Sequence, residues 1–83
     1  MDQEILKELD KILPVVVRVH GEHHPELSQV ADLYAQLKAA PTPEIAAQLR
    51  EITHDFTPPE DACPTFRKTY RDLAQLTEKL NER

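Results

Sequence analysis

Apolar side chains recur at helical spacing along most of this chain, and that periodicity constrains its fold more than any other feature. The clearest run lies toward the C-terminal end, where apolar residues follow one another at steps of three or four positions: Phe66, Tyr70, Leu73, Leu76 and Leu80. This spacing places side chains on one face of an α-helix. No stretch alternates apolar and polar residues over the length of a strand, and no hairpin turn pair occurs. The sequence therefore predicts an all-α protein.

An earlier run of apolar residues over residues 3–20 predicts another helix. Pro14 interrupts this run, so we expect the first helix either to kink there or to give way to a second short helix. Gly21 follows the run and is the only glycine of the chain. Because glycine tolerates the left-handed conformation that often closes a helix, Gly21 is expected to end the first helix in that conformation.

Two further helices are predicted between Gly21 and the last run. One begins at Pro25 and ends near Ala39, and the next begins at Pro43 with Thr42 as its N-cap. The segment DFTPPEDACP has three prolines in ten residues and predicts an extended connector. The expected architecture is a small antiparallel helical bundle of three to four helices, in a single domain of residues 1–83 with the first helix kinked at Pro14.

Asp61 and Thr65 are expected to cap the last helix, since both side chains can accept hydrogen bonds from the first turn. Charged residues from Arg67 to Arg83 are expected to form its solvated face.

Composition limits the classes of function open to the chain. Its 83 residues are 40% hydrophobic and 30% charged, which is typical of a folded domain and unlike a disordered tail or a membrane span. The net charge of −5 disfavours binding to nucleic acids. Cys63 is the single cysteine, so no internal disulfide can form. With no recognisable signal at the N-terminus, a cytoplasmic protein is expected.

Three of the four histidines lie within the stretch VRVHGEHHPELSQV. Imidazoles and carboxylates bind iron and zinc when they converge from rigid elements, so the candidate metal ligands are His20, His23, His24 and Glu26. His20 and His24 are four residues apart, but Gly21 and Pro25 prevent one helix from holding both. The alternative interpretation is a solvated turn between helices with titratable histidines, of which His20 is expected to face inward.

Cys63 admits two interpretations of its own. A single cysteine in a connector is most often a small buried apolar residue, but a thiol at a helix start can also act in redox chemistry or nucleophilic catalysis. The neighbouring residues in sequence supply no base, so a base would have to come from elsewhere in the fold, with His54 as the candidate.

Two long stretches of the chain resemble a known family. RVHGEHHPELSQVADLYAQLK and THDFTPPEDACPTFRKTYRDLAQL are similar to the repair-of-iron-centres proteins, a hemerythrin-like di-iron family thought to restore damaged iron–sulfur clusters. The resemblance implies a four-helix bundle, in agreement with the apolar periodicity. It also implies a pair of irons held by histidines and by His-x-x-x-Glu pairs.

Most of the ligands that the resemblance implies have no counterpart here. His20 matches the histidine of the family's Val-His-Gly stretch, but the His-x-x-x-Glu pair expected beyond Lys38 is absent. Pro43 stands where the third helix of the family opens with a histidine. The ligand expected in the last helix falls at Arg83, and the one in the first helix falls at or before Met1.

The favoured hypothesis is therefore a non-enzymatic helical protein related to this family, with no di-iron site, no catalytic residue and no cofactor. It would act through a protein partner or as a homodimer, without binding nucleic acid or a membrane. The first alternative is an iron- or zinc-binding protein of iron–sulfur cluster repair that uses residues 20–26, completed by a second chain. The second alternative is an enzyme or redox protein that works through Cys63.

Overall fold

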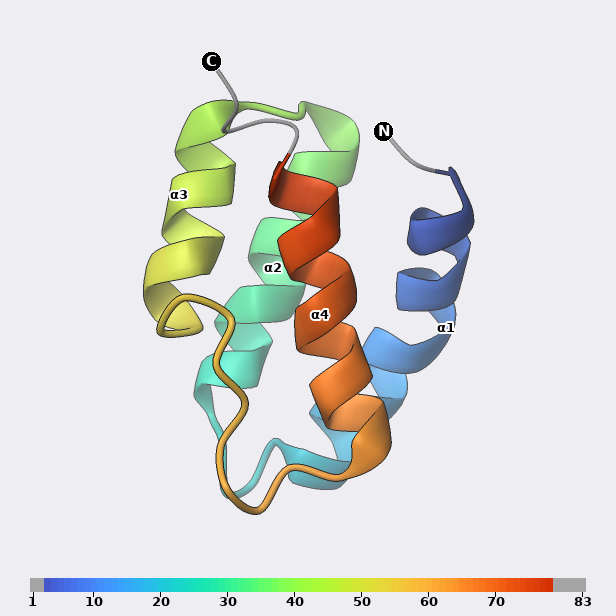
Figure 1. The fold of residues 1–83 in the computed structure, drawn as a ribbon, viewed down its shortest axis with the longest axis vertical. Helices are drawn as coiled ribbons and strands as arrows, with labels where there is room; N and C mark the ends of the chain where they lie inside the picture. Colours follow the sequence, from blue (N-terminus) through green and yellow to red (C-terminus); the bar gives the residue numbers. More distant parts are fainter. Residues whose placement is uncertain (1–2, 79–83) are drawn as a thin grey trace.

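The computed structural model describes residues 3–78 and contains four α-helices and no strand within that range (Figure 1). The helices are α1 (Gln3–His20), α2 (Glu26–Ala39), α3 (Pro43–Ile52) and α4 (Pro64–Glu78). The predicted all-α bundle is thus confirmed. None of the described helices has both the length and the apolar character that a membrane crossing requires. Met1, Leu80 and Arg83 lie outside the described residues.

Successive helices run in opposite directions, so the bundle is antiparallel (Figure 1). The most extensive packing joins α1 to α4 and α2 to α3. The antiparallel pairing of α1 with α4 brings the end of α1 beside the start of α4, where His20 contacts Cys63, 43 positions later in the sequence. The loop between α1 and α2 and the connector between α3 and α4 therefore meet at one end of the bundle, drawn at the bottom of Figure 1.

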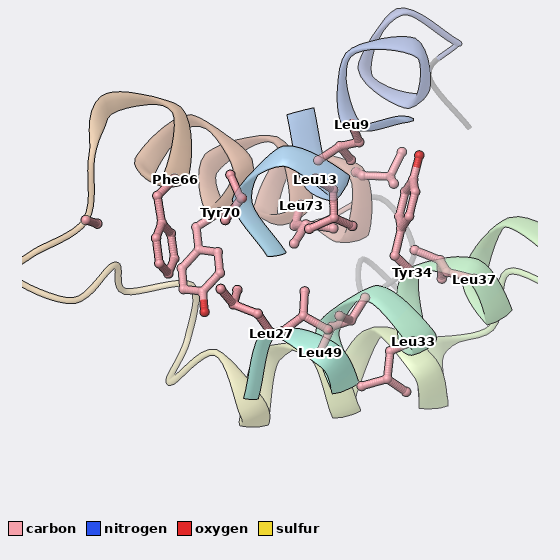
Figure 2. Close-up of a cluster of buried hydrophobic side chains, with 14 residues drawn as sticks. Leu9, Leu13, Leu27, Leu33, Tyr34, Leu37, Leu49, Phe66, Tyr70 and Leu73 are labelled. Atoms are coloured by element: carbon pink, nitrogen blue, oxygen red, sulfur yellow. The ribbon is translucent and has the colours of Figure 1, made fainter. Parts of the chain in front are cut away.

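The core is built from the helical stripes that the apolar spacing predicts. Figure 2 shows side chains from all four helices meeting in one cluster, in which Leu9, Leu27, Leu49 and Leu73 are fully buried. Each such leucine contributes about 1.5–3 kcal/mol relative to an exposed position. Asp72 departs from the expected solvated face of the last helix, because it is only 6% exposed. Its carboxylate accepts a hydrogen bond from Lys68, one helical turn earlier.

The first helix is continuous through Pro14, and its course bends in the second half (Figure 1). It ends at His20, as predicted, but the expected role of Gly21 is wrong. No glycine in the described chain has a positive φ. A Cβ at Gly21 would instead lie 2.4 Å from the carbonyl oxygen of Val17, which accepts a hydrogen bond from the Gly21 N–H. The position needs glycine because the backbone turns too tightly for a side chain.

The third helix begins as predicted, since the hydroxyl of Thr42 accepts a hydrogen bond from the backbone N–H of Ile45. The connector between α3 and α4, residues 53–63, is not extended throughout. His54, Asp55 and Phe56 have φ values of 53°, 61° and 58°, in the left-handed region that non-glycine residues seldom occupy.

Side-chain contacts stabilise this turn. The hydroxyl of Thr53 donates to the carbonyl of Leu49 and accepts from the N–H of Phe56. Arg50 forms an ion pair with Asp55, whose N–H also donates to the Arg50 carbonyl. These local bonds replace those that a helix would have made, so the chain reverses without glycine.

Candidate functional site

The predicted ligands lie where the end of α1, the start of α2 and the connector meet. Residues 20–26, the histidine turn, join the two helices and contain several local backbone hydrogen bonds. The N–H groups of His23 and His24 donate to the carbonyl of His20, and the N–H of Leu27 donates to the carbonyl of His24. Pro25 precedes α2 with a helical φ of −62°. Within this turn His20 and His24 are partly buried, whereas His23 is exposed.

His24 is held between two carboxylates. Its Nε2 lies 3.0 Å from Oδ1 of Asp61 in the connector, and its Nδ1 lies 3.2 Å from Oε2 of Glu26. The side chain of His24 is only 16% exposed, whereas that of Asp61 is 62% exposed. A protonated imidazole donates from both ring nitrogens, so this arrangement favours the charged form of His24.

The same contacts shift the pKa values of His24 and Asp61 in opposite directions. The hydrogen bond with Asp61 raises the pKa of His24 above its ordinary value of 6.5, and the charge of Glu26 adds to the effect. The hydrogen bond with His24 in turn lowers the pKa of Asp61 below 3.8. The pair therefore behaves as a partly solvated ion pair that ties the connector to the histidine turn.

His20 makes a different contact from the one expected for a metal ligand. Its Nε2 lies 3.2 Å from Sγ of Cys63, which is within hydrogen-bond distance for sulfur. The imidazole also meets the ring of Phe66 edge-on, with ring centroids 5.0 Å apart. Phe66 is fully buried and contacts the ring of His24 as well, at 5.6 Å. One buried aromatic ring thus supports both imidazoles.

Cys63 occupies the N-cap position of α4. Its Sγ accepts a hydrogen bond from the backbone N–H of Phe66 at 3.4 Å, and its carbonyl accepts from the N–H of Arg67. The expectation that Asp61 and Thr65 cap this helix is wrong, because the carboxylate of Asp61 is bound to His24 and the capping N–H is taken by sulfur. Cys63 itself is half-buried and packs against the core, so it is less buried than the small core residue that its sequence context favoured.

Of the remaining candidates, Glu26 belongs to this cluster through its contact with His24. His23 and Glu22 are exposed, and Glu26 faces His24 at the edge of a shallow hollow between α2 and α3. His54, the residue that might have approached Cys63, also lines this hollow. The base beside the thiol is therefore His20.

The donor set does not fit the di-iron centre that the resemblance implies. Two bridged irons require carboxylates and imidazoles that converge on one volume. Here the Nε2 of His20 faces sulfur, and both nitrogens of His24 face carboxylates of the surface. Across residues 3–78, no three histidine, cysteine, aspartate or glutamate side chains are gathered so that they could hold a metal ion.

Sequence reasoning missed the two contacts that organise the site. His20 and Cys63 are 43 residues apart, and His24 and Asp61 are 37 residues apart, so no local spacing connects them. The one available signal was their presence in the two stretches that resemble the same family.

Comparison with known proteins supports that resemblance at low identity. The chain is 24% identical to the iron–sulfur cluster repair protein ScdA of Staphylococcus haemolyticus (strain JCSC1435) over 120 residues, which cover 96% of this chain and 54% of the relative. The chain thus spans about half the length of this curated relative. Because the matched region is longer than the 83 residues of the chain, the match passes over segments that have no counterpart here. No family model matches the chain. No solved structure matches it either.

Proposed function

We propose that this protein is a non-enzymatic, cytosolic helical relative of iron–sulfur cluster repair proteins, that it has no di-iron site, and that it acts by contact with a partner protein or with a second copy of itself. The similarity to ScdA supports the relation to cluster repair. The observation that carries the proposal is the arrangement of His20 and His24, whose ring nitrogens face Cys63, Asp61 and Glu26.

This arrangement matters because a ligand must present its free lone pair to the metal. Recruiting His24 would require breaking its contacts with both carboxylates, and recruiting His20 would require displacing the thiol. The His-x-x-x-Glu pair that would supply bridging oxygens beyond Lys38 is absent from the sequence. A single inherited imidazole does not replace those oxygens.

Action through protein contact is supported by the surface of α1. Val15 and Val19 lie one turn apart with 41% and 61% of their surface exposed, and they are the large hydrophobic residues most open to solvent among those described. On the neighbouring side of α1, Pro14 and Val17 line a mainly apolar hollow of about 400 Å³ against α2. Apolar surface of this kind favours contact with another chain.

The decisive experiment is metal analysis of anaerobically purified protein, combined with its mass in solution by sedimentation. We expect no bound iron or zinc, and a melting temperature that ferrous iron and zinc leave unchanged, because a ligand that binds only the folded state raises it. Sedimentation at several concentrations is expected to show reversible self-association, or a monomer that requires a partner. Two metal ions per chain, bound within one copy, would overturn the proposal.

An iron- or zinc-binding protein using residues 20–26 is the alternative. It predicts that added metal shifts the ring resonances of His20, His23 and His24. Unchanged spectra at millimolar metal would eliminate it.

A further inference from the structure

The contact between Cys63 and His20 pairs a nucleophile with a base. Sγ and Nε2 are 3.2 Å apart, and the two residues come from different elements, the connector and the end of α1. Nucleophilic cysteines are activated in this way, by an imidazole within hydrogen-bond distance that takes up the thiol proton. Cys63 is half-buried, so the residue is not enclosed in the core.

The surroundings hold both groups in place. The imidazole of His20 rests against the buried ring of Phe66, and Sγ receives the backbone N–H of Phe66 at 3.4 Å. Arg67 fixes the preceding loop, because its Nε donates to the carbonyl of Ala62. The thiol therefore stands at a defined position, at the N-cap of α4.

We propose that Cys63 and His20 form a thiol-exchange site that takes up a small organic disulfide as a mixed disulfide. The thiol proton passes to Nε2 of His20 while Sγ attacks one sulfur of the disulfide. A bond forms between Sγ and that sulfur, the original sulfur–sulfur bond breaks, and the leaving thiolate receives the proton from His20. One disulfide is consumed and one is formed, so no other oxidant is required.

The chemistry of the site favours disulfide exchange over acyl transfer. Acyl transfer needs hydrogen-bond donors aimed at a developing oxyanion beside the nucleophile. Here the N–H of Phe66 points at the sulfur itself. Disulfide exchange develops charge only along the three sulfurs, so it needs no such donors. Because the chain has one cysteine, an external thiol must reverse the modification.

This inference is independent of the proposed function, and a neutral probe tests it. Reduced protein is mixed with bis(2-hydroxyethyl) disulfide at neutral pH, and the mass of the intact chain is followed over time. We expect the folded protein to react at least about tenfold faster than the same chain unfolded in denaturant, the size of a general-base effect at its lower end. Cys63→Ser is expected to gain no mass.

Two variants distinguish the effect of removing His20 from the effect of removing an imidazole elsewhere in the protein. His20→Gln removes the base and is expected to lose the rate advantage of the folded protein. His54→Asn removes an imidazole elsewhere, in a residue type that tolerates the left-handed region, and is expected to retain that advantage. The proposal is overturned if folded His20→Gln reacts as fast as the natural chain. It is equally overturned if the folded natural chain reacts no faster than the unfolded one, a comparison that holds even if His20→Gln fails to fold.

Discussion

His24 and Asp61 lie 37 residues apart in sequence, yet Nε2 of one is 3.0 Å from Oδ1 of the other. This contact fastens the connector to the histidine turn at the end of the bundle where Cys63 and His20 also meet. Because both partners titrate, it makes part of the stability depend on pH. It therefore allows a sharp test of the described geometry.

The first prediction concerns that pH dependence. Because the pKa of His24 is raised in the folded state, its protonated form stabilises the fold. This stabilisation is fully present below pH 6.5 and is lost as the pH rises through the folded-state pKa. Because the pKa of Asp61 is lowered in the folded state, its ionised form stabilises the fold above pH 3.8. This stabilisation is lost as the pH falls through the folded-state pKa of Asp61. The contribution of the pair is thus greatest between these two values. Asp61→Asn should lower the melting temperature at pH 5 and have a smaller effect at pH 8.

A matched control for this measurement is Asp55→Asn, which breaks an exposed ion pair with Arg50 that contains no histidine. Its effect on the melting temperature should be the same at pH 5 and pH 8. An Asp61→Asn effect that is equally independent of pH would contradict the contact with His24.

The second prediction concerns the hydroxyl of Tyr34, which donates to Oδ1 of Asp10 at 2.8 Å and lies 3.2 Å from the carbonyl of Leu6. These bonds join α2 to α1, and Lys38 adds a third contact to the same carboxylate. Tyr34→Phe should cost about 1.5–3 kcal/mol, measured by urea unfolding, since it removes a hydrogen bond to a charged group.

Tyr70→Phe provides the control for Tyr34. Burial raises the pKa of Tyr70 to about 12, and no hydrogen bond joins its hydroxyl to another described residue, in contrast to the hydroxyl of Tyr34. This change should alter the free energy of unfolding by less than Tyr34→Phe does. Equal costs would mean that the Tyr34–Asp10 bond contributes nothing measurable.

The third prediction concerns the core. Leu73 is fully buried among side chains of α1, α2 and α3, so Leu73→Ala should cost about 2–5 kcal/mol through lost burial and the cavity left behind. Val19→Ala, at a position 61% exposed, should change the free energy of unfolding by less than about 0.5 kcal/mol. In a domain this small the first change should unfold a large fraction of the protein, as circular dichroism would reveal. A tolerated Leu73→Ala would show that the helices pack differently.

The fourth prediction concerns Gly21. An alanine Cβ would lie 2.4 Å from the carbonyl oxygen of Val17, so Gly21→Ala should destabilise the end of α1 by about 1–3 kcal/mol. The neighbouring exposed change Glu22→Ala should have little effect. A stabilising Gly21→Ala, as is common where glycine adopts an ordinary helical conformation without a clash, would show that the turn is more open than described.

The order of the helices, the end of α1 and the start of α3 followed from the amino-acid sequence alone. Steps of three and four between apolar residues such as Phe66, Tyr70 and Leu73 can be satisfied only by helical faces, and Thr42 with Pro43 marks a helix start through purely local chemistry. Prolines and the single glycine located the turns correctly, even where, at Gly21, the physical reason was a close carbonyl and not a left-handed backbone.

The contacts of the histidines and of Cys63, in contrast, depend on the tertiary structure. Which atom faces His20 or His24 depends on how α4 and its connector pack against the end of α1, and sequence spacing contains no information on contacts 37 or 43 residues apart. The left-handed turn at residues 54–56 was missed for a similar reason, because contacts made by Thr53 and Arg50 outweigh the ordinary backbone preferences of those residues. Helix formation is governed by neighbours along the chain, whereas a site is assembled from groups that only packing brings together.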